Sequence, residues 1–221
     1  MIEQRYRKDY PGEFVIINTD IRLGIKEQRR EWIENPNNQA PALTRVAVIG
    51  SSVDRKQFDY QMFERKYTGV RGRNQLATYG TGQIWRDMQL DVYCSTDRPN
   101  LLQLQQSNYQ DNTSIYTTSR FCLMFPEKFF MIPFQPAMND LATAIYLAAF
   151  DGFQDIYLFG YSNDTSGNTR RWQEDVAQVI SAYHTHNFTF VGGVGNMPDI
   201  WRNLPNTDFW NHKKFLHYSG I

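Results

Sequence analysis

Residues 155–164, DIYLFGYSND, decide the fold of this chain. Residues 156–159 form a short apolar run that ends at Gly160, after which the sequence turns polar. Such a run is typical of a strand that is buried on both faces of a parallel sheet. We therefore expect the polar residues after it to lie at the carboxyl edge of the sheet, where ligands bind in open α/β folds.

A helix is predicted over residues 138–153, immediately before this strand. Asn139 or Asp140 can cap it, because a short side-chain oxygen accepts the free amide hydrogens of the first turn. Small and apolar residues recur at helical spacing on one face, namely Leu141, Ala142, Ile145, Ala148 and Ala149. Gly152 supplies a left-handed stop. Helix and strand together make half of a βαβ unit, with the helix lying close against the sheet.

Composition limits the classes of protein that the chain can belong to. The 221 residues carry 23 basic and 23 acidic side chains, so the formal charge is zero. A neutral chain offers no simple argument for nucleic-acid binding, although a local basic patch remains compatible with it. Aromatic residues make up 15% of the chain, and Asn and Gln are abundant, which fits a small polar ligand.

The cysteines and histidines favour neither a disulfide framework nor a metal site. Cys94 and Cys122 lie in apolar stretches and lack a paired metal spacing, which is typical of buried thiols in a reducing compartment. Four histidines without an HxxxH or HxH pattern make a histidine-built zinc site improbable, so no bound metal is expected. Without an apolar run of about 18 residues or an apolar leader, we predict a cytoplasmic protein with no membrane span.

Short apolar runs and helical spacing predict the remaining elements. The expected strands are residues 14–18, 45–49, 67–72, 90–97, 121–125, 129–132 and 188–193. The expected helices are residues 25–34, 58–66, 83–89, 99–106 and 170–184. Strands that alternate with helices in this way are typical of a doubly wound, mostly parallel α/β sheet.

We expect one α/β domain over residues 1–221. Residues 1–43 form an N-terminal extension, since they hold too little apolar surface to fold alone. Residues 44–195 form the sheet core, and residues 196–221 an irregular aromatic wrap or lid.

Polar or small residues follow four of the predicted strands. They are Gly50, Ser51, Ser52, Arg73, Asn74, Ser95, Thr96, Asp97, Tyr161, Ser162, Asn163 and Asp164, joined at the helix start by Asn139 and Asp140. If the strands are parallel, these residues share one edge and form a candidate pocket. A glycine followed by two serines lets a backbone approach a phosphate or ribose closely. The same three residues are equally compatible with a plain tight turn. The sequence holds no Ser-His-Asp set, GxSxG elbow or Walker lysine, so carboxylates, tyrosines, arginines and a bound nucleotide must support any chemistry.

The order of several motifs resembles the bacterial sialyltransferases that use CMP-sialic acid, and a related domain of archaeal hydroxymethylpterin pyrophosphokinase-like proteins. The motifs are VAVIGSS (46–52), FDY (58–60), a strand ending at 73–75, DVYCSTD (91–97) and a helix that runs into GFQDIYLFGYSND (152–164). The resemblance spans residues 46–193. It implies a nucleotide-sugar-dependent glycosyltransferase with a Rossmann-like sheet that works without a bound metal.

The resemblance also implies where the nucleotide-sugar donor binds. The residues are Gly50, Ser51, Ser52, Asn74, Asn139, Asp140, Gly160 and Tyr161. The first three would contact the phosphate and ribose, Asn74 would hydrogen-bond the nucleotide, and Gly160 and Tyr161 would lie beside the sugar. Asn139 and Asp140 stand where the family has Thr-Ser-Gly, a departure that leaves the identity of the donor open.

The family's catalytic base is a histidine in the lid, and this sequence has no histidine in the corresponding segment. Asp97 or Asp164 can instead take the proton of the acceptor hydroxyl, while Arg170 or Arg171 offsets charge on the leaving phosphate. His212 can fold over the site as part of a lid. The alternative interpretation makes the arginines surface charges at a helix start and His212 an ordinary surface histidine.

The acceptor is a small molecule, a glycan or modified DNA. Short, neutral, Asn/Gln-rich chains are typical of phage proteins, and some phages glycosylate the hydroxymethylated cytosines of their own DNA. Arg71, Arg73, Arg86 and Arg98 near the predicted strand ends could grip a DNA backbone, and the enzyme would have to extrude the target base.

Two other functions remain open. The fold can serve as a nucleotide-binding module without catalysis, such as a regulatory or defence-interfering protein that sequesters a nucleotide, and the missing histidine favours this. It can also be a pyrophosphokinase-like enzyme. That activity needs magnesium, and therefore more carboxylates than Asp97, Asp140 and Asp164.

Overall fold

The structure is a computed structural model. It describes residues 13–22, 25–34, 45–63, 76–133, 138–162, 169–192 and 197–219. The chain divides into two compact units, Met1–Ala42 and Leu43–Ile221.

The first unit contains an antiparallel pair of strands, β1 (Glu13–Arg22) and β2 (Ile25–Glu34). The strand predicted at 14–18 is confirmed within β1, whereas the helix predicted at 25–34 is wrong. Lys, Glu, Gln and Arg favour a helix by only tenths of a kcal/mol per residue. Pairing along ten residues of β1, from Glu13 opposite Glu34 to Arg22 opposite Ile25, overrides that preference.

The second unit is built on one eight-stranded sheet in the order β10-β9-β8-β3-β4-β5-β6-β7, in which every neighbouring pair is parallel. The strands are β3 (Arg45–Ile49), β4 (Ala77–Gly80), β5 (Val92–Cys94), β6 (Ser114–Thr117), β7 (Phe130–Met131), β8 (Asp155–Phe159), β9 (Asn187–Val191) and β10 (Thr207–Trp210). The chain runs outward from β3 to β7, returns to β8 on the other side of β3, and continues to β10. This confirms the doubly wound, Rossmann-like α/β fold.

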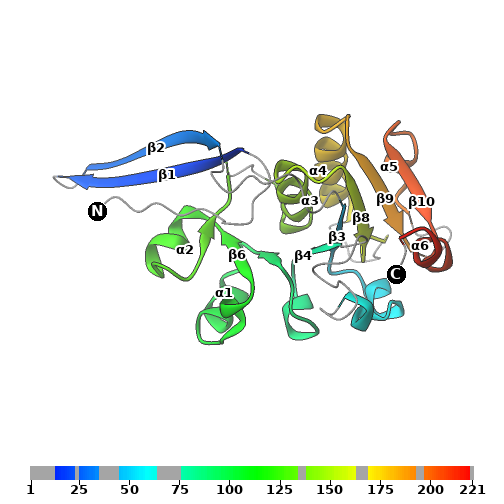
Figure 1. Cartoon of the computed structure of the whole chain (residues 1–221), viewed down its shortest axis with the longest axis horizontal. Helices are drawn as coiled ribbons and strands as arrows, with labels where there is room; N and C mark the ends of the chain where they lie inside the picture. Colours follow the sequence, from blue (N-terminus) through cyan, green and yellow to red (C-terminus); the bar gives the residue numbers. More distant parts are fainter. Residues whose placement is uncertain are drawn as a thin grey trace. The chain divides into compact units, whose positions relative to one another are not determined.

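Helices cover both faces of this sheet (Figure 1). They are α1 (Arg98–Gln105), α2 (Ser119–Met124), α3 (Asp140–Phe150), α4 (Thr169–Ala182), α5 (Asp199–Arg202) and α6 (His212–Ser219), with 3-10 turns η1 (Val53–Gln57), η2 (Tyr60–Phe63), η3 (Ile84–Arg86) and η4 (Tyr109–Asp111). One core cluster joins the sheet to α3, α4 and α5, and another joins it to α1, α2, α6 and the turns η2 and η3. Alternate residues of β3 enter opposite clusters, Val46 and Val48 the first, Ala47 and Ile49 the second.

Helix α3 forms as the sequence predicts. Asn139 is its N-cap and accepts a hydrogen bond from the Ala142 amide at 2.9 Å. At the other end Gly152 has φ of +88° and donates to the Ala149 carbonyl. The buried face in between consists mainly of alanines, which brings the helix close to the sheet.

Several predicted elements need correction. Residues 121–124 of the strand expected at 121–125 lie in helix α2. Phe121 is buried while Leu123 and Met124 are exposed, so only one side of the segment packs against the core. A short apolar run in the sequence does not distinguish such a helix from a buried strand. Strands β4 and β6 are not among the predicted strands. Only short 3-10 turns form within 58–63 and 83–89, and the strand expected at 67–72 lies outside the described residues.

The C-terminal tail is regular and not the irregular wrap expected from its sequence. It adds β10 to the edge of the sheet, paired in parallel with β9, and then α6. Phe215 of α6 is fully buried against Phe58, Tyr157 and Phe159. The tail therefore completes the second core cluster.

This position of α6 predicts a pH effect at His212, whose ring packs edge-on against Phe58 at 5.3 Å. Burial lowers the pKa of His212 from its ordinary value of 6.5, and the nearby Asp54 opposes the shift. His212 therefore binds a proton more tightly in the unfolded chain than in the folded protein. The free energy of unfolding is highest above the ordinary pKa of 6.5 and falls as the pH drops below that value. We expect His212→Gln to flatten the loss of stability between about pH 7 and pH 5.

Urea unfolding at a series of pH values measures this effect. His184→Gln, which changes an exposed histidine, is the control. The same pH slope in wild type and His212→Gln would show that burial of His212 does not couple to folding.

Candidate functional site

A cavity of about 580 Å³ opens at the carboxyl edge of the sheet. The residues after three strands line it: Ser51 after β3, Thr81 and Gly82 after β4, and Asp97 after β5. Helices complete the lining with Asn100, Met138, Asn139, Asp140, Leu141, Arg171, Trp172 and Asp175. Its size falls in the range of small-molecule sites, about 300 to 1,000 Å³. It lies near the topological switch point, where the chain changes direction between β3 and β8.

Beside the cavity, the ends of β3 and β8 meet backbone to backbone at two glycines. The Gly50 amide donates to the Phe159 carbonyl at 2.7 Å, and the Ser52 amide donates to the Gly160 carbonyl at 3.0 Å. A Cβ atom at Gly50 would lie 2.5 Å from the Gly160 carbonyl oxygen. Gly160 has φ of +69°, and its own Cβ would lie 2.9 Å from the Arg55 Cβ. Both positions therefore require glycine for packing.

Ser52 and Tyr161 belong to the same packed region and do not line the cavity. The Ser52 and Ser162 hydroxyls share a buried hydrogen bond of 2.6 Å. The Tyr161 hydroxyl donates to the Leu141 carbonyl at 2.9 Å, and burial raises the pKa of Tyr161 well above its ordinary value. These side chains hold β8 against β3 and α3.

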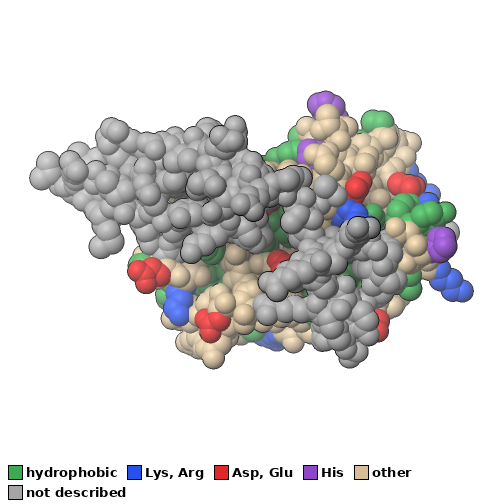
Figure 2. All heavy atoms as spheres, in the orientation of Figure 1, with side chains coloured by type: hydrophobic (Ala, Val, Ile, Leu, Met, Phe, Trp, Pro, Cys, Tyr) green, Lys and Arg blue, Asp and Glu red, His purple; other side chains and the backbone are tan. Residues whose placement is uncertain are grey.

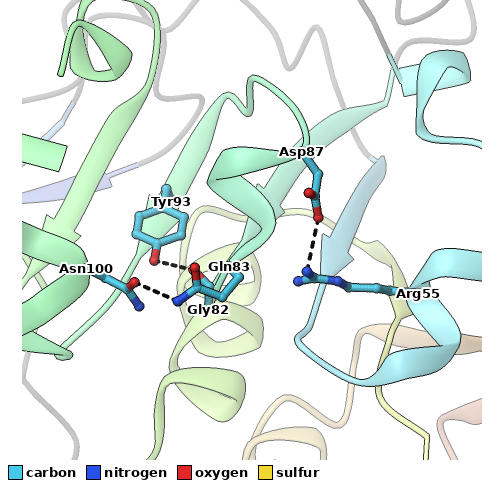
Figure 3. Close-up of polar contacts among 6 residues, drawn as sticks. All are labelled: Arg55, Gly82, Gln83, Asp87, Tyr93 and Asn100. Carbon is cyan, nitrogen blue, oxygen red and sulfur yellow. Dashed lines mark hydrogen bonds and ion pairs between the residues drawn. The ribbon is translucent and has the colours of Figure 1, made fainter. Parts of the chain in front are cut away.

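The loop after β4 is fixed by polar contacts that Figure 3 shows. Tyr93 of β5 donates its hydroxyl to the Gly82 carbonyl at 2.7 Å, and the Gln83 amide donates to Asn100 Oδ1 of α1 at 2.8 Å. Further along, Arg55 of η1 forms an ion pair with Asp87 at 3.0 Å. These contacts connect the segments that follow β3, β4 and β5 at the carboxyl edge of the sheet.

Asp140, the first residue of α3, ties that helix to the loop after β5. Its carboxylate accepts hydrogen bonds from Ser95 Oγ at 3.0 Å, from the Thr96 amide at 3.0 Å and from Thr96 Oγ1 at 2.6 Å. A carboxylate is also favourable in the first turn of a helix. Asp140 therefore shapes the wall of the cavity through contacts within the protein.

Asn139 links the start of α3 to α4. Its backbone amide and its side-chain amide both donate to Asp175 Oδ2, at 3.1 and 2.6 Å. One turn earlier in α4, Trp172 packs edge-on against Trp201 at 5.6 Å and Tyr161 at 6.5 Å. Trp172 and Asp175 are three residues apart, which puts them on one face of the helix.

Asp97 is the N-cap of α1, where its Oδ2 accepts the Asn100 amide at 3.2 Å. The side chain is exposed and borders the cavity. Because one oxygen caps the helix, Asp97 has a fixed position while its other oxygen faces no hydrogen-bond donor within the described part of the chain.

The structure brings together part of the site that the sequence predicts. Ser51, Asp97, Asn139, Asp140 and Arg171 line the cavity. Gly50, Ser52, Gly160 and Tyr161 do not, and they pack the strand ends instead. His212 packs on Phe58, in the core cluster of the opposite face. Asn74, Asp164 and the side chain of Arg170 lie outside the described residues, as do Arg71 and Arg73.

Sequence reasoning missed Thr81, Gly82, Asn100, Trp172 and Asp175 as lining residues. The first two follow β4, a strand that was not predicted. Trp172 and Asp175 lie near the start of the helix predicted at 170–184. Their spacing of three residues, which puts them on one face of that helix, is the signal that could have identified both.

Charges of both signs are interspersed over the described surface that Figure 2 shows. Among the residues that the structure describes, no group of three or more His, Cys, Asp or Glu side chains could hold a metal ion. Within the same part of the chain, no helix is both long and apolar enough to cross a membrane.

The fold and cavity place this chain among doubly wound α/β proteins with a candidate ligand site at the carboxyl edge. No family model matches the sequence, and no curated protein matches it. Among solved structures the chain is similar to the sialyltransferase CstII from Campylobacter jejuni, determined in complex with a substrate analogue, cytidine-5'-monophosphate. The identity is 12% and the TM-score 0.46, over 76% of this chain and 89% of the other.

Proposed function

We propose that the protein is a glycosyltransferase that uses a nucleotide-sugar donor and transfers the sugar to an acceptor hydroxyl. The observation that carries the proposal is the cavity of about 580 Å³ at the carboxyl edge, lined by hydroxyl, amide, carboxylate and guanidinium groups. Nucleotides bind at this edge in doubly wound folds. The order of sequence motifs from VAVIGSS to GFQDIYLFGYSND supports a sugar transferase among the possible nucleotide-binding proteins.

The lining residues suggest how transfer would proceed. Asp97 is the described carboxylate that best fits a general base, because the helix cap fixes it and leaves one oxygen for the acceptor hydroxyl. Arg171 is exposed at the same cavity and would offset charge on the leaving phosphate. Ser51, at the end of β3, would hydrogen-bond the donor. The sugar thus passes from the phosphate oxygen to the acceptor oxygen while Asp97 takes the acceptor's proton.

A thermal-shift panel of CMP, UMP, GMP, ADP and their sugar conjugates tests the proposal. A ligand at one hundred times its dissociation constant stabilises by about 2.7 kcal/mol, which corresponds to several degrees for a chain of this size. For each donor that binds, the release of nucleotide is then measured with simple hydroxyl acceptors. A folded protein that no member of the panel shifts would contradict the proposal.

The second candidate function is a nucleotide-binding module without catalysis. The observation that favours it is that Asp140 and Asn139 form hydrogen bonds with other residues of the protein. Their polar groups therefore serve the structure of the cavity wall and not a reaction. This function predicts a thermal shift without release of nucleotide from any donor.

Modified DNA remains one proposed acceptor. Arg86 and Arg98 are the described members of the four arginines expected to grip it, and both are exposed. Arg86 already donates to Gln103 and lies over the Trp85 ring. If DNA is the acceptor, duplex DNA should retain the protein at low salt and release it as salt rises. Absence of salt-sensitive retention removes this acceptor class.

A further inference from the structure

The charge of the cavity wall limits the kind of sugar that it can hold. The described lining includes three carboxylates, from Asp97, Asp140 and Asp175, and one guanidinium, from Arg171. Ion pairs join Arg55 to Asp87, Arg202 to Asp199 and Lys214 to Asp208. None of them involves the cavity, so its described wall carries a net negative charge.

Two of the three carboxylates keep an oxygen for a ligand. Both oxygens of Asp140 accept hydrogen bonds from the loop after β5. Asp175 uses Oδ2 for Asn139, and Asp97 uses Oδ2 for the Asn100 amide. The second oxygens of Asp97 and Asp175 meet no donor in the described ranges. An ionised carboxylate accepts hydrogen bonds only, so hydroxyl or amino groups suit these positions.

A third polar group at the cavity also lacks a partner. Thr81 is 1% exposed, lines the cavity, and its Oγ1 forms no hydrogen bond with the described residues. It lies near the buried Cys94 thiol and lowers the pKa of that thiol, while burial has the larger effect and raises that pKa. A thiol is a weak partner for a hydroxyl. The Thr81 hydroxyl therefore keeps hydrogen-bonding capacity that a polar ligand in the cavity can use.

Trp172 adds an aromatic surface to the same wall. The ring is half-buried and held by Trp201 and Tyr161, so its orientation is fixed. Such a ring offers apolar area next to the carboxylate of Asp175, one turn further along α4. Apolar ring area beside hydrogen-bond acceptors suits a sugar ring, which has C–H groups on its faces and hydroxyl groups at its edges.

We propose that the donor sugar is neutral or carries an amino group, and that the cavity discriminates against sugars that bear a carboxylate. The inference rests on the proposed function, since it names the sugar class for the same site. A sugar carboxylate would face Asp175, and like charges placed together cost affinity. A hydroxyl or ammonium group at the same place would donate to it.

The test compares two donors that differ in one group, UDP-glucose and UDP-glucuronic acid, or the same pair on another base that the nucleotide panel selects. Calorimetric titration should show the glucose donor binding at least about tenfold more tightly, with the glucosamine donor no weaker than glucose. UDP alone is titrated in parallel. If UDP and the other nucleotides fail to bind, the proposed function fails, and the sugar inference with it.

Asp175→Asn tests the assignment of the selectivity to the carboxylate. The substitution keeps the side-chain shape and removes the charge, so the preference for glucose should fall to about threefold or less while affinity for UDP alone stays unchanged. Asp111→Asn, at an exposed position outside the cavity lining, should keep the wild-type preference. Equal binding of the two donors by wild type, or an undiminished preference in Asp175→Asn, would overturn the inference.

Discussion

Gly160→Ala should lower the free energy of unfolding by about 3 to 5 kcal/mol, the largest single loss that the structure predicts. Two costs add at this residue. Its φ of +69° is unfavourable for alanine by about 1 to 2 kcal/mol. The new Cβ would also lie 2.9 Å from the Arg55 Cβ and 3.1 Å from the Gly50 carbonyl oxygen. Gly50 follows β3 and is hydrogen-bonded to Phe159 of β8, so a shift of its carbonyl would disturb the contact between the two strands.

Gly152→Ala is the matched control, because Gly152 also has positive φ, +88°, but a Cβ there meets nothing within 4 Å. It should show the conformational cost alone, about 1 to 2 kcal/mol. Guanidinium unfolding of both variants gives the difference, expected at about 2 kcal/mol or more. Equal losses in the two variants would mean that the close approach of the strand ends adds nothing.

Asp140→Ala is expected to have the second largest effect, a loss of about 2 to 3 kcal/mol together with weakened ligand binding. The substitution removes the acceptor of the Ser95 hydroxyl, the Thr96 amide and the Thr96 hydroxyl. The loop after β5, which carries Asp97, would then lose its connection to α3. Chemical denaturation measures the loss of stability, and calorimetric titration of the folded variant with nucleotide measures the loss of ligand affinity.

Asp140→Asn tests how much of this effect depends on the hydrogen-bond acceptor oxygens of the side chain. Asparagine keeps one acceptor oxygen for Thr96, so about half of the stability loss should return. If Asp140 serves as we describe, Asp140→Asn should bind nucleotide much better than Asp140→Ala. Wild-type stability and binding in Asp140→Ala would show that the loop after β5 is held by other contacts.

Local sequence signals predicted the centre of the fold correctly, as α3 and β8 show. The Asn139 cap, the Gly152 stop and the apolar run 156–159 each act within a few residues, so sequence reveals them. β4 and β10 have weak local signals, ATYG and TDFW. Their stability comes from pairing with β3, β5 and β9, which a linear sequence does not display. For the same reason β2 was predicted as a helix.

The lining residues of the cavity were predictable from the sequence only where the end of the neighbouring strand, or the start of the neighbouring helix, was predicted correctly. Asp97, Asn139 and Asp140 follow or precede elements with clear signals, and all three line the cavity. Thr81 was missed because β4 was missed. Gly50 and Gly160 were assigned to the ligand because a glycine that allows close approach to a phosphate looks the same in sequence as one that allows close approach of two strands.

The central claim is that the cavity at the carboxyl edge binds a nucleotide. Ser51 is exposed and lines this cavity, so Ser51→Trp would fill it without disturbing the core. Ser181→Trp, at an exposed position of α4 outside the cavity, is the control. Calorimetric titration of the nucleotide that the panel selects should show equal binding to wild type and Ser181→Trp, and at least about a tenfold loss in Ser51→Trp. Undiminished binding to a folded Ser51→Trp variant would place the nucleotide elsewhere and contradict the account.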